Sequence, residues 1–336
     1  MRNLWFLLVL TLTLFGGTTV KIATYNVENL FDLHYNGTEY KEYIPNTIWK
    51  WNKKTYRAKL KNISKVIIDL NPDIISLTEI ESDLALQDLQ KELSRQGLYF
   101  RFRSIASKKQ TSVRNAILSK YPIRSKELYI SRSRGTRNIL EAKVIIGGKP
   151  LYIYVNHWKS KSGPESKRII YAKVLKQRLD SLPKNTDYIL MGDFNAHYEE
   201  LKTFIKKRKH NDTKGITGIN HILKTIDSNN ELFTRQSLKP EGNYNLWMEV
   251  PEKDRWSHIY KGKKEALDHI IISPSLLNTN KNYYILDSFE SFKAPYLFTK
   301  SGKKLYRWQR SRSRPLHHTK KGYSDHLPIS ANFFIK

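Results

Sequence analysis

The chain has 336 residues, 39% of them hydrophobic, so it is long enough to bury a sizeable core, and its composition excludes a fibrous or disordered protein. Its 59 Lys and Arg exceed its 31 Asp and Glu, giving a formal net charge of +28 that attracts nucleic acid, anionic membranes or acidic polysaccharides. A basic surface that only keeps the protein soluble is the alternative interpretation. The absence of cysteine excludes disulfides, thiolate metal sites and a cysteine nucleophile.

The first residues have the pattern of a secretory signal. One cation, Arg2, precedes an almost purely apolar run at residues 4–15, which is followed by Gly16 and Gly17. This run is well short of the roughly 20 residues that a membrane-spanning helix needs. We therefore expect a signal peptide at residues 1–19, a single domain at residues 20–336, and an exported monomer, periplasmic or secreted, without a stable membrane anchor.

The remaining chain alternates between strand and helix patterns, which indicates a mixed α/β protein. Apolar, β-branched runs predict strands at residues 21–27, 73–80, 115–118, 141–146, 151–155, 187–191, 266–272 and 329–335. Apolar residues at helical spacing predict helices at residues 56–70, before Pro72, and at residues 165–182. The polar, basic residues 206–214 and 300–321 are predicted to be surface loops or lids, and residues 227–254 carry no clear pattern.

Polar side chains lie near the ends of several predicted strands, where a lone buried polar group would be costly. Asn26 and Glu28 are two residues apart and so lie on the same side of an extended chain. The other polar residues near strand ends are Glu79, Asn156, His157, Asp193, Asn195, Asp268, Asp325 and His326. Each alone is equally well explained as a turn former. Together they supply oxygen ligands, in Glu28, Glu79 and Asp325, of the kind that suits Mg²⁺, Mn²⁺ or Ca²⁺.

Six motifs follow one another along nearly the whole chain: TYNVENLFD, SLTEIE, YVNHWKSK, MGDFN, LDHIIIS and SDHLPI. In this order they resemble the endonuclease/exonuclease/phosphatase (DNase I-like) superfamily, and the NVENLFD and NHWKSK forms are most similar to its bacterial exported nucleases. The resemblance implies an α/β fold in the form of a four-layer sandwich. In such a fold two mixed β-sheets pack face to face and helices cover the outside.

The resemblance also implies a metal site. Glu79 would be the principal ligand, and Asn26, Glu28 and Asp325 would complete or support the site. Mg²⁺ is the expected cation, with Mn²⁺ and Ca²⁺ as alternatives.

The implied catalytic residues surround the scissile phosphate. Asp193, Asn195 and His157 would lie beside it, and His326 would pair with Asp268. An aspartate bound to one ring nitrogen fixes the tautomer and raises the basicity of the other nitrogen. In relatives, the residue equivalent to Asp193 and the residue equivalent to His326 have each been assigned as the base that deprotonates the attacking water. We choose His326.

The positive charge favours DNA as the substrate, with RNA also open, cleaved with little sequence preference. Cations near the His157 strand are candidates for contacts to flanking phosphates: Arg137, Lys159, Lys161 and Arg168. A phospholipid or inositol phosphate is the alternative substrate. An inactive nucleic-acid-binding protein ranks last, because every inferred site position holds a chemically competent residue.

Overall fold

The computed structural model describes residues 16–107, 111–131, 135–204 and 209–336. Most of the expected signal peptide, residues 1–15, lies outside this described part, as do residues 206–208 of the basic segment at 206–214. Within the described residues, no helix has the length and apolar character that crossing a membrane requires.

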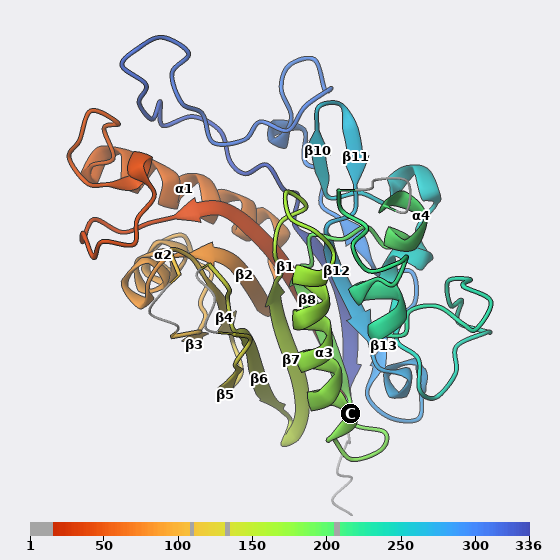
Figure 1. The fold of residues 1–336 in the computed structure, drawn as a ribbon. Helices are drawn as coiled ribbons and strands as arrows, with labels where there is room; N and C mark the ends of the chain where they lie inside the picture. Colours follow the sequence, from red (N-terminus) through yellow and green to blue (C-terminus); the bar gives the residue numbers. More distant parts are fainter. Residues whose placement is uncertain (1–15, 108–110, 132–134, 205–208) are drawn as a thin grey trace, which may run out of the picture.

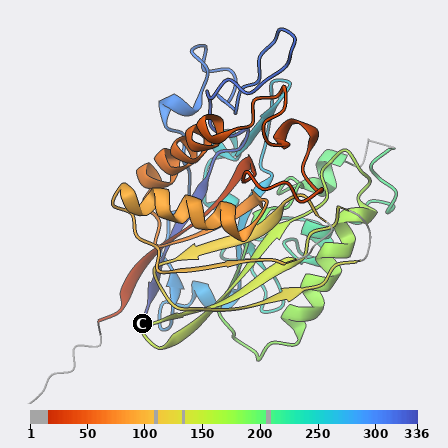
Figure 2. The same ribbon diagram turned by 90° about the vertical axis from the view of Figure 1, so that its left-hand side faces the viewer.

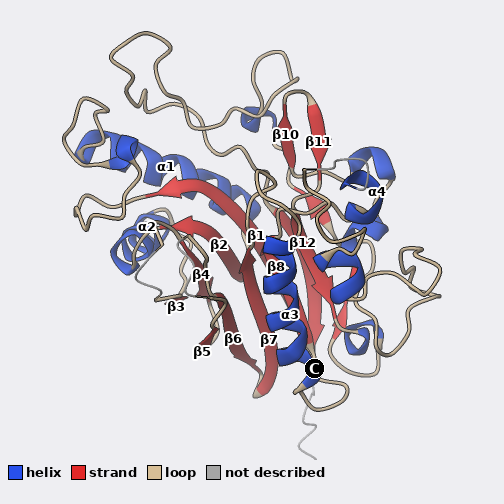
Figure 3. Ribbon diagram, in the orientation of Figure 1, coloured by secondary structure: helices blue, strands red, loops and turns tan. Residues whose placement is uncertain are grey.

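Two mixed β-sheets pack face to face, with helices outside them, which confirms the expected four-layer sandwich (Figures 1 and 3). In the described chain the first sheet has seven strands in the order β13-β15-β1-β2-β4-β3, with β14 also paired to β15. These strands are β1 (Thr18–Leu30), β2 (Ile74–Ile80), β3 (Phe102–Ile105), β4 (Arg114–Ser119), β13 (Tyr283–Tyr284), β14 (Glu290–Ser291) and β15 (Ile329–Ile335).

Among the described residues, the second sheet has six strands in the order β5-β6-β7-β8-β12-β9. A separate two-stranded ribbon, β10-β11, projects from one edge of the sandwich (Figure 1). The strands of the second sheet are β5 (Ile123–Leu128), β6 (Ile139–Ile146), β7 (Lys149–His157), β8 (Tyr188–Asp193), β9 (Tyr244–Asn245) and β12 (Asp268–Ile272). The ribbon consists of β10 (His258–Tyr260) and β11 (Lys263–Glu265).

Helices cover the outer faces of both sheets, as the turned view in Figure 2 makes clear. Helices α1 (Lys53–Leu70) and α2 (Asp83–Arg95) lie on the first sheet, and α3 (Ser166–Asp180) lies on the second. Asn52 and Ser82 cap the amino ends of α1 and α2 through their side-chain oxygens. The shorter helices are α4 (Glu200–Phe204), η1 (Lys41–Tyr43), η2 (Gly218–Ile222), η3 (Leu246–Glu249), η4 (Glu252–Asp254), η5 (Pro274–Leu277) and η6 (Pro295–Leu297).

The alternation of side chains along each strand explains the layers. In β1, Val20 and Ile22 enter the core between the sheets, whereas Tyr25 and Val27 enter the core beneath α1 and α2. A third core lies between α3 and the second sheet and includes Leu175. Because both faces of β8 and β12 are covered, these strands are apolar along most of their length.

Candidate active site

The polar residues at the strand ends meet at one edge of the sandwich. Strands β1 and β2 are parallel, as are β7 and β8, so the carboxyl ends of each pair lie together. His157 is the register partner of Asp193, and the first residue of the antiparallel strand β12, Asp268, is the register partner of Asp193 on its other side. The site is thus assembled from both sheets.

Asn26 joins the two central carboxylates. Its Nδ2 donates to Glu79 Oε1 at 3.2 Å and to Asp193 Oδ2 at 3.1 Å. The Nε2 atom of His157 lies 3.8 Å from Glu79 Oε1 and 3.7 Å from Asp193 Oδ2. One amide, one imidazole and two carboxylates from four different strands therefore share a single small volume.

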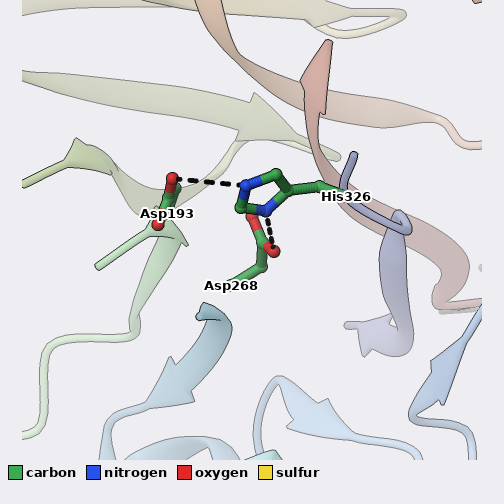
Figure 4. Close-up of side chains that lie close together, drawn as sticks. All are labelled: Asp193, Asp268 and His326. Carbon is green, nitrogen blue, oxygen red and sulfur yellow. Dashed lines mark hydrogen bonds and ion pairs between the residues drawn. The ribbon is translucent and has the colours of Figure 1, made fainter. Parts of the chain in front are cut away.

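His326 lies between the carboxylates of Asp268 and Asp193 (Figure 4). Its Nδ1 is 2.7 Å from Asp268 Oδ2, and its Nε2 is 3.9 Å from Asp193 Oδ2. Ser257 Oγ donates to the same Asp268 oxygen at 2.6 Å, which fixes the carboxylate. Burial lowers the pKa of His326, but the carboxylates of Asp268 and Asp193 outweigh it and raise the pKa well above its ordinary value.

Burial and crowding make the carboxylates unusually basic. Burial raises the pKa of Asp193 to about 7; the charge of His326 lowers this pKa, and that of Asp268 raises it. Burial, and then the charge of Asp325, raise the pKa of Glu79. Burial also lowers the pKa of His157 well below its ordinary value, so this imidazole is neutral. Buried carboxylates with raised pKa values mark an arrangement that a bound cation would stabilise.

The donor set fits a divalent metal ion. Asp193, Asp268 and His326 each offer one ligand atom within 4.8 Å of the others, and this buried group is consistent with a divalent metal site. Two buried polar atoms at the site, His157 Nδ1 and Asp268 Oδ1, have no hydrogen-bond partner in the described structure. Carboxylate, amide and imidazole groups without thiolates favour Mg²⁺ or Mn²⁺ over soft metals.

Three of the expected site residues have left-handed backbones. Glu28 has φ 52°, Glu79 has φ 67° and Asn195 has φ 48°, a region in which residues other than glycine are uncommon. Such conformations cost energy and cluster at functional sites. The amide of Asn195 donates to the Trp158 carbonyl at 3.1 Å, and its backbone N–H donates to Asp193 Oδ1 at 2.8 Å, which holds it beside the carboxylates.

Glu28 and Asp325 are held by a residue that the sequence did not reveal. Arg307 Nε donates to Glu28 Oε1 at 2.8 Å, and its Nη2 lies 3.0 Å from Asp325 Oδ2. The backbone N–H of Trp308 donates to the other Glu28 oxygen at 3.1 Å. The carboxylate of Glu28 therefore faces Arg307, whereas Asp325 acts electrostatically on both Glu79 and His326.

The four predicted phosphate-binding cations divide into two groups. Arg137 and Lys159 line a pocket of about 360 Å³, and the charge of Arg137 affects the pKa of both Glu79 and His157. Lys161 instead pairs with Glu200 and Glu265, at 2.8 and 3.3 Å.

The structure corrects the expectation that Arg168 contacts a flanking phosphate. It is fully buried, with its Nε 2.7 Å from Glu165 Oε2, and it donates to the carbonyls of Ser160 and Gly163 at 3.2 and 3.3 Å. A guanidinium without a solvent face cannot meet a flanking phosphate, so Arg168 holds the loop that follows His157.

Comparisons with known proteins agree with this geometry. A family model described as "Endonuclease/Exonuclease/phosphatase family" matches residues 21–334. No curated protein matches the sequence.

Solved structures share the fold at low sequence identity. TDP2 from D. rerio, complexed with a single strand DNA product, is 14% identical with a TM-score of 0.57, over 94% of this chain and 99% of that one. An AP endonuclease from Archaeoglobus fulgidus is 14% identical with a TM-score of 0.56, over 93% and 98%. The mannosyl-6-phosphatase Bt3783 from Bacteroides thetaiotaomicron is 14% identical with a TM-score of 0.52, over 94% and 99%. At such identities the likeness concerns the fold alone.

Proposed function

Since this chain belongs to the endonuclease/exonuclease/phosphatase family, we propose that it is an exported, divalent-metal-dependent phosphodiesterase that hydrolyses DNA with little sequence preference. RNA is the nearest alternative substrate. The observation that carries the proposal is the gathering of Asn26, Glu79, His157, Asp193 and the His326–Asp268 pair at one edge of the sandwich. An imidazole bound to a buried carboxylate, beside a set of oxygen ligands, suits phosphate-ester hydrolysis.

Glu79 and Asp193 would hold the cation, and Asp325 would support it electrostatically. Asn26, whose Oδ1 accepts from the Glu28 backbone N–H, would orient the two carboxylates through its Nδ2. Mg²⁺ is the expected ion, and Mn²⁺ or Ca²⁺ would fit the same oxygen ligands. When bound, the cation would offset negative charge on the phosphoryl oxygens and favour the ionisation of water. The raised pKa values of Glu79 and Asp193 support this assignment, because a cation would offset the burial and the neighbouring negative charges that raise them.

The protein's own groups would move the proton and hold the phosphate. Asp268 accepts a hydrogen bond from His326 Nδ1 at 2.7 Å, which orients the ring. The positive charge of a bound cation would lower the raised pKa of His326, so that Nε2 could take a proton from the attacking water. His157, neutral because of its burial, can donate a hydrogen bond to a phosphoryl oxygen. Asn195 can donate the second N–H of its amide there while keeping its bond to Trp158.

Charge supports a nucleic-acid substrate. The net charge of +28 attracts a polyphosphate backbone, and the pocket lined by Arg137 and Lys159 is positioned to receive a phosphate beside the scissile one. The solved relatives include a TDP2 complex with single strand DNA and a mannosyl-6-phosphatase, so one fold serves unlike phosphate esters. Phospholipid and inositol phosphate therefore belong in the test as alternatives.

The proposal is tested by incubating the purified mature protein with plasmid DNA, RNA, sphingomyelin and an inositol phosphate in Mg²⁺, Mn²⁺ or EDTA. DNA should be cleaved only with metal, and His326→Ala and Glu79→Ala should each lose about 100-fold or more in rate. The exposed His34→Ala serves as the matched control. Cleavage of lipid or inositol phosphate without cleavage of DNA would refute the substrate assignment.

Export is tested separately. Expression of the full chain in a bacterial host should yield an exported protein whose mass reflects loss of about 17–19 residues. An uncleaved product that stays in the cytoplasm would contradict this part of the proposal.

A further inference from the structure

Residues 300–321, hereafter the basic arm, are the most one-sidedly charged segment outside the site. They contain nine Lys and Arg and no Asp or Glu. The eight cations besides Arg307 are all exposed: Lys300, Lys303, Lys304, Arg310, Arg312, Arg314, Lys320 and Lys321. In Figures 1 and 2 the arm rises above α1 and away from the sandwich.

Internal bonds give the arm a defined shape. The backbone N–H of Gln309 donates to the Lys321 carbonyl at 2.8 Å, and that of Ser311 donates to the His317 carbonyl at 2.7 Å. These bonds join the outgoing and returning segments of the arm, as in a hairpin. Trp308 Nε1 donates to His318 Nδ1 at 2.8 Å, and both of these side chains are buried. The cations are therefore presented on a fixed support rather than on a free tail.

The base of the arm is attached to the candidate active site. Arg307 bridges Glu28 and Asp325, which are neighbours in sequence of Asn26 and His326. The fully buried Lys59 donates to the carbonyls of Glu28 and Tyr323 at 3.0 and 3.1 Å, which ties β1 to the returning end of the arm. The arm therefore leaves and rejoins the fold beside the catalytic residues.

The outer cations of the arm are not neutralised. Arg310 pairs with Glu42 at 2.8 Å, but no carboxylate of the described chain forms an ion pair with Arg312, Arg314, Lys320 or Lys321. The one large hydrophobic side chain that is strongly exposed in this arm, within the described structure, is Leu316, at 38%. Charge without an apolar face suits a polyanion in water better than insertion into a bilayer.

We propose that the basic arm binds the phosphate backbone of the nucleic-acid strand that extends from the scissile phosphate. This inference rests on the proposed function, because it takes the bound strand to be the substrate. The seven residues from Arg307 to Ser313 make six Cα steps and span at most about 20 Å when extended. At about 3.4 Å per base pair, the outer cations therefore meet phosphates within roughly six base pairs of the cut. Longer substrates gain these contacts, and shorter ones do not.

The test compares two variants with equal loss of charge. The arm variant carries Arg312→Gln, Arg314→Gln, Lys320→Gln and Lys321→Gln. The control carries Lys149→Gln, Lys184→Gln, Lys239→Gln and Lys281→Gln, all at exposed positions outside the arm and the site. Cleavage of a 30-base-pair duplex and of bis(p-nitrophenyl) phosphate is measured from 50 to 200 mM salt, and duplex binding is measured in EDTA by fluorescence anisotropy.

The arm variant should lose at least about tenfold in kcat/KM on the duplex relative to the small diester. The slope of log affinity against log salt should fall by about 0.9 per lost phosphate contact, or roughly 3 to 4 in all. Equal losses in the two variants, or no loss in the arm variant, would overturn the inference.

Two further outcomes separate this inference from the proposed function. If neither substrate is cleaved by the wild type but the arm variant still binds the duplex more weakly than the control, the proposed function fails and the inference stands. If the arm variant binds phosphatidylglycerol vesicles more weakly while its duplex affinity equals that of the control, the arm serves a membrane and the inference is overturned.

Discussion

The pairing of His326 with Asp268 offers the most direct test of the proposed mechanism. The carboxylate of Asp268 is contacted by His326 Nδ1 at 2.7 Å and by Ser257 Oγ at 2.6 Å. Asp268→Asn removes the charge of this carboxylate and nearly preserves the shape of the side chain. A hydrogen bond to a charged group contributes roughly 1.5–3 kcal/mol. Since about 1.4 kcal/mol is a factor of ten in rate, we expect kcat/KM on DNA to fall by about 10- to 100-fold.

The assay is steady-state cleavage of a fluorescent duplex at saturating Mg²⁺, with circular dichroism to confirm folding. Ser257→Ala is the matched control, because it removes one donor to Asp268 but leaves the bond from His326, so it should lose less. The double variant Asp268→Asn/His326→Gln should be no slower than His326→Gln alone, because Asp268 acts through the imidazole. Wild-type activity in Asp268→Asn, or losses that multiply in the double variant, would refute this reasoning.

Three further changes test the metal, the electrostatics and the attachment of the arm. Glu79→Gln should weaken Mn²⁺ binding by about tenfold or more in isothermal titration calorimetry, and affinity equal to that of wild type would remove Glu79 from the metal site. Burial opposes ionisation of Glu265, but the ammonium groups of Lys161 and Lys263 together outweigh burial and lower the pKa of Glu265 to about 2. The charge of Glu265 therefore stabilises the fold above its ordinary pKa near 4.5, and this stabilisation is lost as pH falls through about 2. The Tm difference between wild type and Glu265→Gln should shrink between pH 5 and pH 2, and a constant difference would contradict this. Arg307→Met should destabilise the fold by roughly 1–2 kcal/mol in urea, because it removes the half-exposed guanidinium that pairs with the buried Glu28 carboxylate. Adding Glu28→Gln should recover part of that loss, and no recovery would show that the pair is not the cause.

Sequence reasoning found the sheets and most of the site for one physical reason. Strands that are buried on both faces are apolar until they reach an edge, so the polar residues that end them are conspicuous. Asn26, Glu79, His157 and Asp193 all lie where the parallel pairing of two strands ends or close to that point, and parallel neighbours bring such positions together. The four-layer sandwich itself came from the resemblance in motif order, because periodicity alone indicates only an α/β fold.

Long-range pairing explains what the sequence did not reveal. Arg307 contacts Glu28 across 279 residues, and nothing in the basic pattern around it distinguishes it from its exposed neighbours. Arg168 is different, because its partner Glu165 is three residues away, a spacing that favours contact on one helix face. That spacing was a usable sign of an internal ion pair, although its full burial depends on the loop after His157 folding back over it.

The division of the site between two sheets makes activity a reporter of tertiary assembly. Asn26 and Glu79 belong to the first sheet, and His157, Asp193 and Asp268 to the second. Neither sheet carries a complete set of reacting groups, so a molecule whose sheets separate would lose activity before either sheet unfolds. A chain nicked between β4 and β5 would be active only while its fragments remain associated, which suits this protein to fragment complementation.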